Sequence, residues 1–215
     1  MVKAIIFDLD GTLLDTLPDL NACMNEMLAH FGFPAITLAQ TRLYVGHGGR
    51  EFTAMSLPDD KKDMTDECYA FYGKIHVNHV NDKTKMFEGE SAFLKRLRER
   101  GIKTAIVTNK AQNTTDILCK TLLKDFPFDV VQGNSVNYPV KPDPASTLAV
   151  LEKLGVSPEE AVFVGDGDTD VQTAKNAGMR CVSVLWGYRT KEELICAGAT
   201  CFARNFQELE EKIFQ

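Results

Sequence analysis

Five short runs rich in apolar and β-branched residues are spaced along the chain, and most are continuously apolar rather than alternating with polar residues. They are Ala4–Phe7, Thr104–Val107, Asp129–Val131, Ala161–Val164 and Cys181–Val184. Continuous apolar runs are typical of parallel strands that helices cover on both faces. Amphipathic helical segments separate the runs, so the sequence predicts an α/β fold with a doubly wound parallel sheet.

Local signals predict where some of the helices begin and end. Leu148, Leu151 and Leu154 would share one helix face, and Gly155 follows as a stop signal. Residues Ser157–Glu160 resemble a capping box with proline at the first helical position, which predicts another helix start.

One interval between the predicted strands is far longer than a single crossover helix needs. It runs from Asp8 to Thr104, and its residues 15–85 contain no convincing strand but two apolar stripes at helical spacing. The stripes are Leu17, Leu20, Met24, Met27, Leu28 and Phe31, then Met64, Cys68, Phe71, Tyr72 and Ile75. The sequence therefore predicts a core domain of residues 1–14 and 86–215, with a helical domain of residues 15–85 inserted after the first strand.

Composition excludes several classes of protein. The net charge of −6 is unsuited to coating a nucleic acid or an anionic membrane, and no apolar run approaches the ~20 residues of a membrane span. The six cysteines are scattered without a Cys-x-x-Cys pair, which favours reduced thiols. We therefore expect a cytoplasmic protein without nucleic-acid or membrane partners.

Acidic residues follow the first predicted strand. Asp8 and Asp10 stand two positions apart in the segment DLDGTLLDT of residues 8–16, so their side chains point the same way if the chain stays extended. Like charges packed at a buried strand end are costly unless they share a cation or a proton. An isolated Asp-x-Asp would be ordinary loop sequence, but the whole segment indicates a functional site.

Weaker signals follow the second and third predicted strands. Thr108 and Asn109 offer a hydroxyl, an amide and backbone N–H groups that suit a phosphate oxygen, although Thr-Asn is also an ordinary helix-cap sequence. Lys141 stands just before Pro142 on a stiff stretch that could aim its ammonium, or it could be a solvated lysine in a turn. The residues alone leave both alternatives open.

Three aspartates gather after the fourth predicted strand. Asp166, Asp168 and Asp170 suit a hard cation such as Mg²⁺, which prefers carboxylate and water oxygens. Asp168 could instead only cap the following helix, and Asp166, directly after the strand, is the better ligand.

Together these segments resemble the haloacid dehalogenase superfamily and its phosphatase branch. Residues 8–16 match the first motif of that family, Thr108 the second, Lys141 the third, and residues 165–170 the fourth. The order is the family's, the match covers the predicted core, and the helical insertion stands where the family places its cap domain. Within subfamily IA the resemblance is strongest to the phosphoglycolate phosphatases, because residues 45–49 and 185–189 also look like theirs. Gly167 departs from the serine or threonine of many relatives.

The resemblance implies a Rossmann-like core, a magnesium cofactor and roles for individual residues. Asp8 would be the nucleophile that forms an aspartyl-phosphate, and Asp10 the general acid and base. The Asp8 carboxylate, the Asp10 carbonyl oxygen and Asp166 would hold Mg²⁺. Asp170 would orient Lys141 or a metal-bound water.

Other residues are expected to bind the substrate. Thr108, Asn109 and Lys141 would contact the transferring phosphoryl group, Lys141 with a catalytic role. The Gly-rich loop of the cap, with Gly48, Gly49 and Arg50, would contact the leaving group, and His47 could add a donor.

The expected substrate is a small phosphorylated metabolite, with 2-phosphoglycolate as first choice. A β-phosphoglucomutase-like phosphoryl transferase remains an alternative, because both Asp8 and Asp10 are present. An inorganic pyrophosphatase is a further alternative. A catalytically silent phosphate-binding protein is the alternative outside the enzymes. The sequence allows either a monomer or a homodimer.

Overall fold

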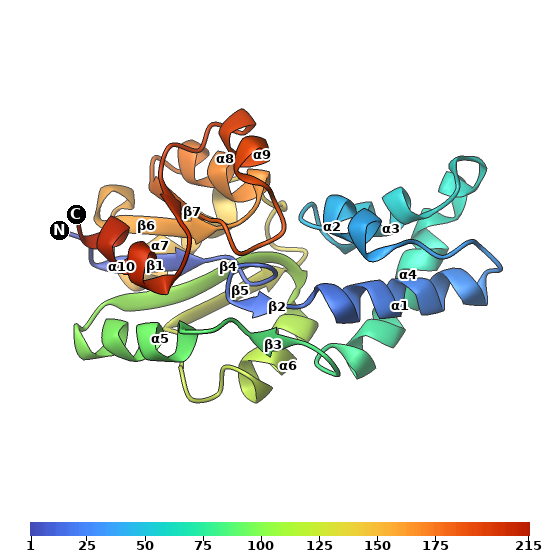
Figure 1. Cartoon of the computed structure of the whole chain (residues 1–215), viewed down its shortest axis with the longest axis horizontal. Coiled ribbons are helices and arrows are strands. Elements are labelled where there is room, and N and C mark those ends of the chain that lie inside the picture. The colour runs from blue at the N-terminus through green and yellow to red at the C-terminus, as the bar shows by residue number, and fades with distance from the viewer.

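A six-stranded parallel sheet forms the centre of the larger part of the protein (Figure 1). The structure is a computed structural model that describes residues 1–215. The strand order is β5-β4-β1-β6-β7-β8. The strands are β1 (Ala4–Phe7), β4 (Lys103–Ala111), β5 (Val130–Asn134), β6 (Ala161–Gly165), β7 (Arg180–Val184) and β8 (Phe202–Ala203). The predicted doubly wound parallel sheet is confirmed.

The first strand lies at the point where the strand order reverses. Phe7 of β1 stands opposite Ile106 on one neighbour and Val164 on the other, so β1 is paired on both edges. In an open parallel sheet, ligands bind beyond the carboxyl ends of the strands at such a reversal. The residues that follow β1, β4 and β6 therefore meet at one edge.

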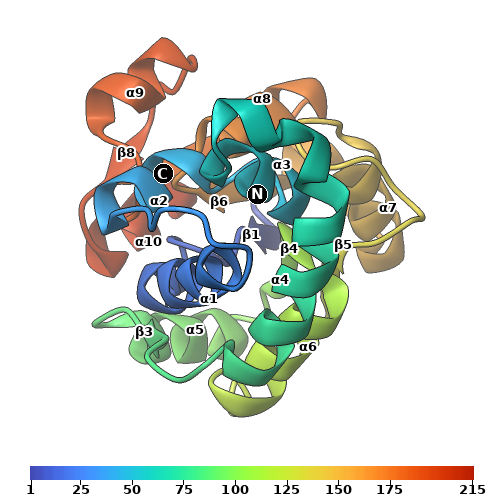
Figure 2. The same cartoon turned by 90° about the vertical axis from the view of Figure 1, so that its right-hand side faces the viewer.

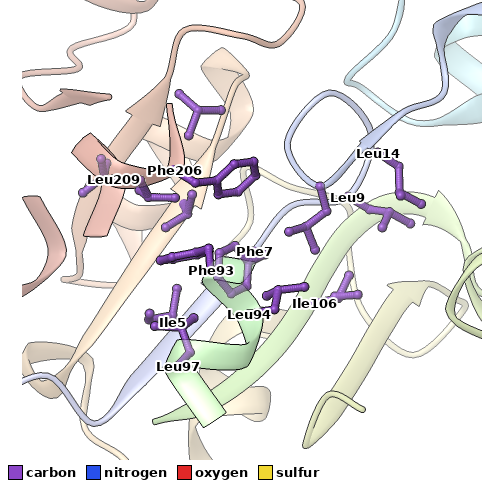
Figure 3. Close-up of a cluster of buried hydrophobic side chains, with 14 of the residues drawn as sticks. Ile5, Phe7, Leu9, Leu14, Phe93, Leu94, Leu97, Ile106, Phe206 and Leu209 are labelled. Atoms are coloured by element: carbon purple, nitrogen blue, oxygen red, sulfur yellow. The ribbon is translucent and has the colours of Figure 1, made fainter. Parts of the chain in front are cut away.

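The two faces of the sheet are covered by different helices. Alternate residues of β1 point to opposite faces, Ile5 and Phe7 into one core cluster and Ile6 into the other. Figure 3 shows the first cluster, where Phe7 meets Phe93 at a ring-centroid distance of 6.2 Å. The first face carries α5 (Glu90–Glu99), α6 (Gln112–Thr121) and α10 (Phe206–Phe214); the second carries α7 (Ala145–Leu154) and α8 (Asp168–Asn176). A further helix, α9 (Lys191–Cys196), packs through Leu194 against Val171 of α8.

Four helices and one short 3-10 helix form a separate layer beyond the carboxyl edge of the sheet (Figures 1 and 2). They are α1 (Leu17–His30), α2 (Leu38–Tyr44), α3 (Gly49–Ser56), the 3-10 helix Asp59–Met64 and α4 (Thr65–His79). They enclose their own apolar cluster, to which both predicted stripes contribute. We call this layer the cap.

A short antiparallel ribbon lies where the chain enters and leaves the cap. It consists of β2 (Leu14–Asp15) and β3 (Lys85–Met86), with Leu14 opposite Met86. The expected boundaries at residues 14/15 and 85/86 fall within this ribbon. The division into two domains at these residues stays a prediction.

Three details differ from the sequence-based expectations. Leu148 is exposed, and Val150 takes the buried position beside Leu151, because the helix face is rotated relative to the predicted stripe. Residues Pro158–Glu160 form only a 3-10 turn without a side-chain cap, since β6 begins directly afterwards. β4 continues past Val107, through an irregular register, to Ala111. Thr108 and Asn109 therefore lie within the last part of this strand and not after it. No helix combines the length and apolar character needed to cross a membrane.

Candidate active site

The segment after β1 places two aspartates at the sheet edge. The Asp8 N–H still donates to Val164 O at 2.9 Å, so Asp8 continues the strand pairing before the chain turns. Gly11 has φ +84°, and a Cβ there would lie 2.3 Å from an oxygen of Asp166. Glycine is therefore required on both counts for the turn to pack against Asp166.

Three buried carboxylates converge beyond β1 and β6. Asp8, Asp166 and Asp170 each offer an oxygen within 4.8 Å of the others. Burial raises the pKa of Asp8 to about 6 and that of Asp166 to about 7, and the neighbouring carboxylates add to both shifts. So many buried carboxylates call for cationic partners.

The donor set fits Mg²⁺. All the available ligand atoms are hard oxygens, and Asp166 is fixed by a Thr12 hydroxyl at 2.8 Å and by the Tyr188 N–H at 2.7 Å. Both Asp8 contacts, from the Leu9 N–H and Lys141 Nζ, use Oδ1, which leaves Oδ2 without a protein donor. Asp8 and Asp166 are expected ligands; Asp170 joins this cluster, whereas the Asp10 side chain does not.

Lys141 supplies one buried positive charge. Its Nζ lies 2.6 Å from Asp170 Oδ1 and 3.0 Å from Asp8 Oδ1. Burial opposes the charged form, but Asp170 and Asp8 outweigh it and raise the pKa of Lys141 above its ordinary value. The ammonium therefore stays protonated and holds the Asp8 carboxylate in place.

The Asn109 side chain connects this lysine to the cap. Its amide oxygen accepts from the Lys141 N–H at 2.7 Å, and its amide nitrogen donates to Lys141 O at 3.1 Å and Gly46 O at 2.9 Å. Thr108 lines the cavity beside it. Asn109 thus fixes the Lys141 backbone and the Gly-rich loop together.

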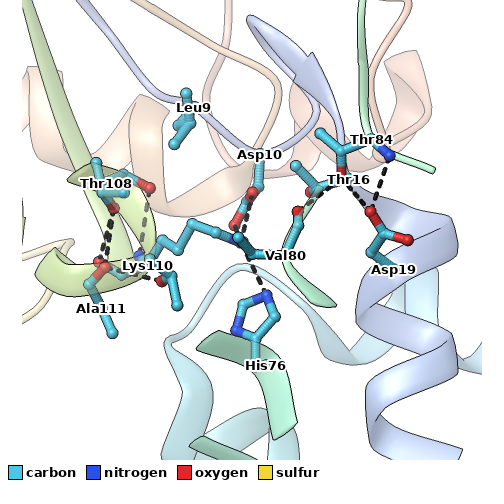
Figure 4. A network of polar contacts seen from close by, with 12 residues as sticks. Leu9, Asp10, Thr16, Asp19, His76, Val80, Thr84, Thr108, Lys110 and Ala111 are labelled. Carbon is cyan, nitrogen blue, oxygen red and sulfur yellow. Dashed lines mark hydrogen bonds and ion pairs between the residues drawn. The ribbon is translucent and has the colours of Figure 1, made fainter. Parts of the chain in front are cut away.

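Lys110 supplies a second buried charge, and its role was not expected from the sequence. Its Nζ lies 3.1 Å and 3.3 Å from the two Asp10 oxygens and 3.5 Å from His76 Nε2 on α4 (Figure 4). Burial and the Lys110 charge lower the pKa of His76 to about 2, so the imidazole is neutral. The position of Lys110 directly after Thr108 and Asn109 could have indicated a role in the site. For His76 the sequence offered no such indication, because it predicted only a helix there.

A cavity of about 80 Å³ lies between the sheet edge and the cap. Asp8, Asp10 and Thr108 line it from the core, and the Gly-rich loop and α4 close it from the cap. The expected substrate residues Gly48 and Gly49 line this cavity. A volume of this size suits a small ligand.

The side chains of Arg50 and His47, which were also expected to contact the substrate, lie outside the cavity. The Arg50 side chain is exposed and its Nε pairs with Asp66 Oδ1 at 2.7 Å on α4. His47 Nε2 lies 3.5 Å from Asp168 Oδ2. Neither residue lines the cavity. For Arg50 the reason is that α3 begins at Gly49 and directs this side chain toward α4.

Arg189 fastens the Gly-rich loop to the core. Its guanidinium donates to Arg42 O at 2.6 Å and Val45 O at 2.7 Å, and its Nε lies 3.5 Å from Asp168 Oδ1. Sequence reasoning noted residues 185–189 as a segment but assigned Arg189 no contact. The structure shows it as the link between that segment and the cap.

Comparisons with known proteins agree with this geometry. Residues 5–184 match the family model described as haloacid dehalogenase-like hydrolase. Phosphoglycolate phosphatase 1 of Pseudomonas aeruginosa is 31% identical over 96% of this chain and 78% of that protein. Phosphoglycolate phosphatase of Rhodospirillum rubrum is 36% identical over 97% of this chain and 90% of that protein. The crystal structure of a proposed phosphoglycolate phosphatase from Lactobacillus delbrueckii subsp. bulgaricus superposes with a TM-score of 0.92 at 28% identity, covering 98% of both chains.

Proposed function

The chain belongs to the haloacid dehalogenase-like hydrolases and is a phosphatase that acts on small phosphates, and we propose that its substrate is 2-phosphoglycolate. The names of the two relatives support this choice of substrate. So does the small cavity, which leaves room for a short leaving group between Asp10 and the cap.

The placement of Asp8 is the observation that carries the mechanism. Its carboxylate lines the cavity, is held through Oδ1 by Lys141 and is free of protein donors at Oδ2. In the proposed first step the carboxylate attacks phosphorus, the bond to the leaving oxygen breaks, and an acyl phosphate forms on Asp8. Water then attacks this phosphorus and releases phosphate and the free carboxylate.

Asp10 would transfer the protons in both half-reactions. It would give a proton to the leaving oxygen and then take one from the attacking water. Its position on the cavity wall, two residues after Asp8, supports this role.

Positive groups would stabilise the phosphoryl group during transfer. Lys141 and the Thr108 hydroxyl would bind its oxygens, Asn109 would fix Lys141, and Asp170 would orient the Lys141 ammonium. Asp8, the Asp10 carbonyl and Asp166 would hold Mg²⁺, which when bound neutralises the carboxylates and the phosphate oxygens.

The cap would select the leaving group and exclude water. Gly48 and Gly49 allow the loop backbone to come close to a ligand, and Arg189 and Asn109 hold that loop against the core. We propose that the enzyme is cytoplasmic, that it is a monomer or a homodimer, and that its partner is a small phosphorylated metabolite and neither a nucleic acid nor a membrane. The net charge of −6 supports the absence of nucleic-acid and anionic membrane partners.

The test is kcat/KM, with Mg²⁺, across 2-phosphoglycolate, sugar phosphates, nucleoside monophosphates and pyrophosphate. We expect 2-phosphoglycolate to lead. A tenfold lead for pyrophosphate or a hexose phosphate, about 1.4 kcal/mol in transition-state binding, would replace the proposed substrate. No turnover of any ester, p-nitrophenyl phosphate included, would indicate a silent phosphate-binding protein.

A further inference from the structure

Two cationic side chains line the cavity, and they differ in what they are free to bind. Each of the three Arg189 guanidinium nitrogens already contacts a protein acceptor, namely Arg42 O, Val45 O or Asp168 Oδ1. Lys110 has one carboxylate partner, Asp10, and a longer contact to His76. Lys110 is therefore the cation held by fewer protein groups, with capacity for a ligand.

Lys110 also stands where a leaving group would extend. Asp10, which would protonate the leaving oxygen, lies directly beside that oxygen during the reaction. Lys110 Nζ contacts both Asp10 oxygens, so the atoms attached to the leaving oxygen come next to this ammonium.

We infer that Lys110 is a specificity-determining residue that binds a carboxylate on the substrate's leaving group. The inference rests on the proposed function and specifies its substrate class: a short phosphomonoester with a carboxylate on the carbon next to the ester oxygen. An ammonium has three donors, so Lys110 keeps one for Asp10 and offers another to the ligand.

The surroundings of Lys110 favour an anionic group over a neutral one. The lysine side chain is only 2% exposed, and Tyr72 stacks on His76 at a centroid distance of 5.2 Å and shields this side of the cavity. Since a charged pair is stronger where water is excluded, a carboxylate gains more here than a hydroxyl. The neutral His76 adds no second charge, which makes the preference depend on Lys110.

The experiment compares 2-phosphoglycolate with 2-hydroxyethyl phosphate, which replaces the carboxylate by CH2OH at nearly the same length. For the wild-type enzyme we expect kcat/KM to favour 2-phosphoglycolate by about 10–100-fold, the discrimination typical of one hydrogen bond to a charged group. Lys110→Met should lower this ratio at least tenfold. If the substitution acted only by disturbing Asp10, it would slow the hydrolysis of both esters equally, and the ratio of their kcat/KM values would not change.

Lys120→Met is the matched control, because it removes the same charge from the exposed end of α6. It should leave the ratio within about twofold of wild type. If Lys110→Met does not fold, the same ratio is measured for Lys110→Gln and compared with the wild-type ratio, and the same tenfold decrease is expected.

A wild-type ratio near one overturns the inference, and so does an equal loss of both activities in Lys110→Met. If a different short phosphomonoester with a carboxylate leads the wider panel while the ratio still depends on Lys110, the proposed substrate fails and the inference stands; a leading hexose phosphate overturns both. If the wild-type enzyme turns over no ester, both fail together.

Discussion

Asp170 Oδ1 lies 2.6 Å from the ammonium of Lys141, and both side chains are almost fully buried. Asp170 on α8 thereby holds a lysine that also reaches Asp8 at 3.0 Å. Lys141 comes from the long connection between β5 and α7, and its two contacts link Asp8 after β1 to Asp170 after β6.

Lys141→Met should destabilise the protein strongly. Removing one partner of a buried ion pair leaves Asp170 and Asp8 without compensation, which typically costs about 3–5 kcal/mol. Urea denaturation would measure the free energy of unfolding, and Lys141→Met/Asp170→Asn should recover part of the loss. A single-variant loss below about 1 kcal/mol would contradict this account of the pair.

Asp8→Asn should abolish turnover while keeping the fold. An amide is a poor nucleophile at phosphorus, so we expect kcat to fall by about 10³-fold or more. Rapid quenching should trap a phosphorylated wild-type enzyme and no phosphorylated variant. Near-normal turnover in Asp8→Asn would exclude the covalent route.

Mg²⁺ should both activate and stabilise the enzyme. EDTA should remove activity and added Mg²⁺ restore it, whereas Ca²⁺ should inhibit because its looser coordination misplaces the Asp8 oxygens. At 100 times its dissociation constant Mg²⁺ should add about 2.7 kcal/mol to stability, visible as a higher Tm. Asp166→Asn should lose most of this Tm shift, and full activity in excess chelator would argue against the site.

Arg50→Ala should have little effect on catalysis. The Arg50 side chain is exposed and pairs with Asp66 outside the cavity, and exposed ion pairs contribute little to stability or binding. We expect kcat/KM for 2-phosphoglycolate to change less than about threefold. A loss of tenfold or more would mean that the loop brings Arg50 into the site when substrate binds.

Glu90 should make stability depend on pH. It is fully buried at the start of α5, its Oε1 has no hydrogen-bond partner, and burial raises its pKa from 4.5 to about 9. Between these values the unfolded chain releases the proton and the folded protein keeps it, so stability falls as pH rises.

Glu90→Gln removes this titration and should be less sensitive to alkaline pH. Between pH 5 and pH 8 the wild type should lose about 1 kcal/mol per pH unit more than the variant. Denaturation at both pH values would measure the difference, with Glu88→Gln as the exposed control. Parallel pH profiles for wild type and Glu90→Gln would mean that Glu90 is ionised in the folded protein.

The sequence predicted those parts of the structure that depend on local patterns. The continuous apolar runs identified the strands, and residues that directly follow β1 and β6, such as Asp8 and Asp166, had to meet at one sheet edge. The capping box at Thr37 is equally local, because it needs only Gln40 three positions later.

Contacts between distant segments could not be predicted in this way. Lys110 meets His76 across 34 residues, and this meeting depends on how α4 packs over the end of β4. Arg50 stands next to the loop glycines in sequence, yet the start of α3 turns its side chain to Asp66 and away from the cavity. Sequence spacing alone thus determined which backbone segments carry the chemistry, and the packing of the cap on the core decided which side chains face the substrate, because side-chain direction depends on both surfaces.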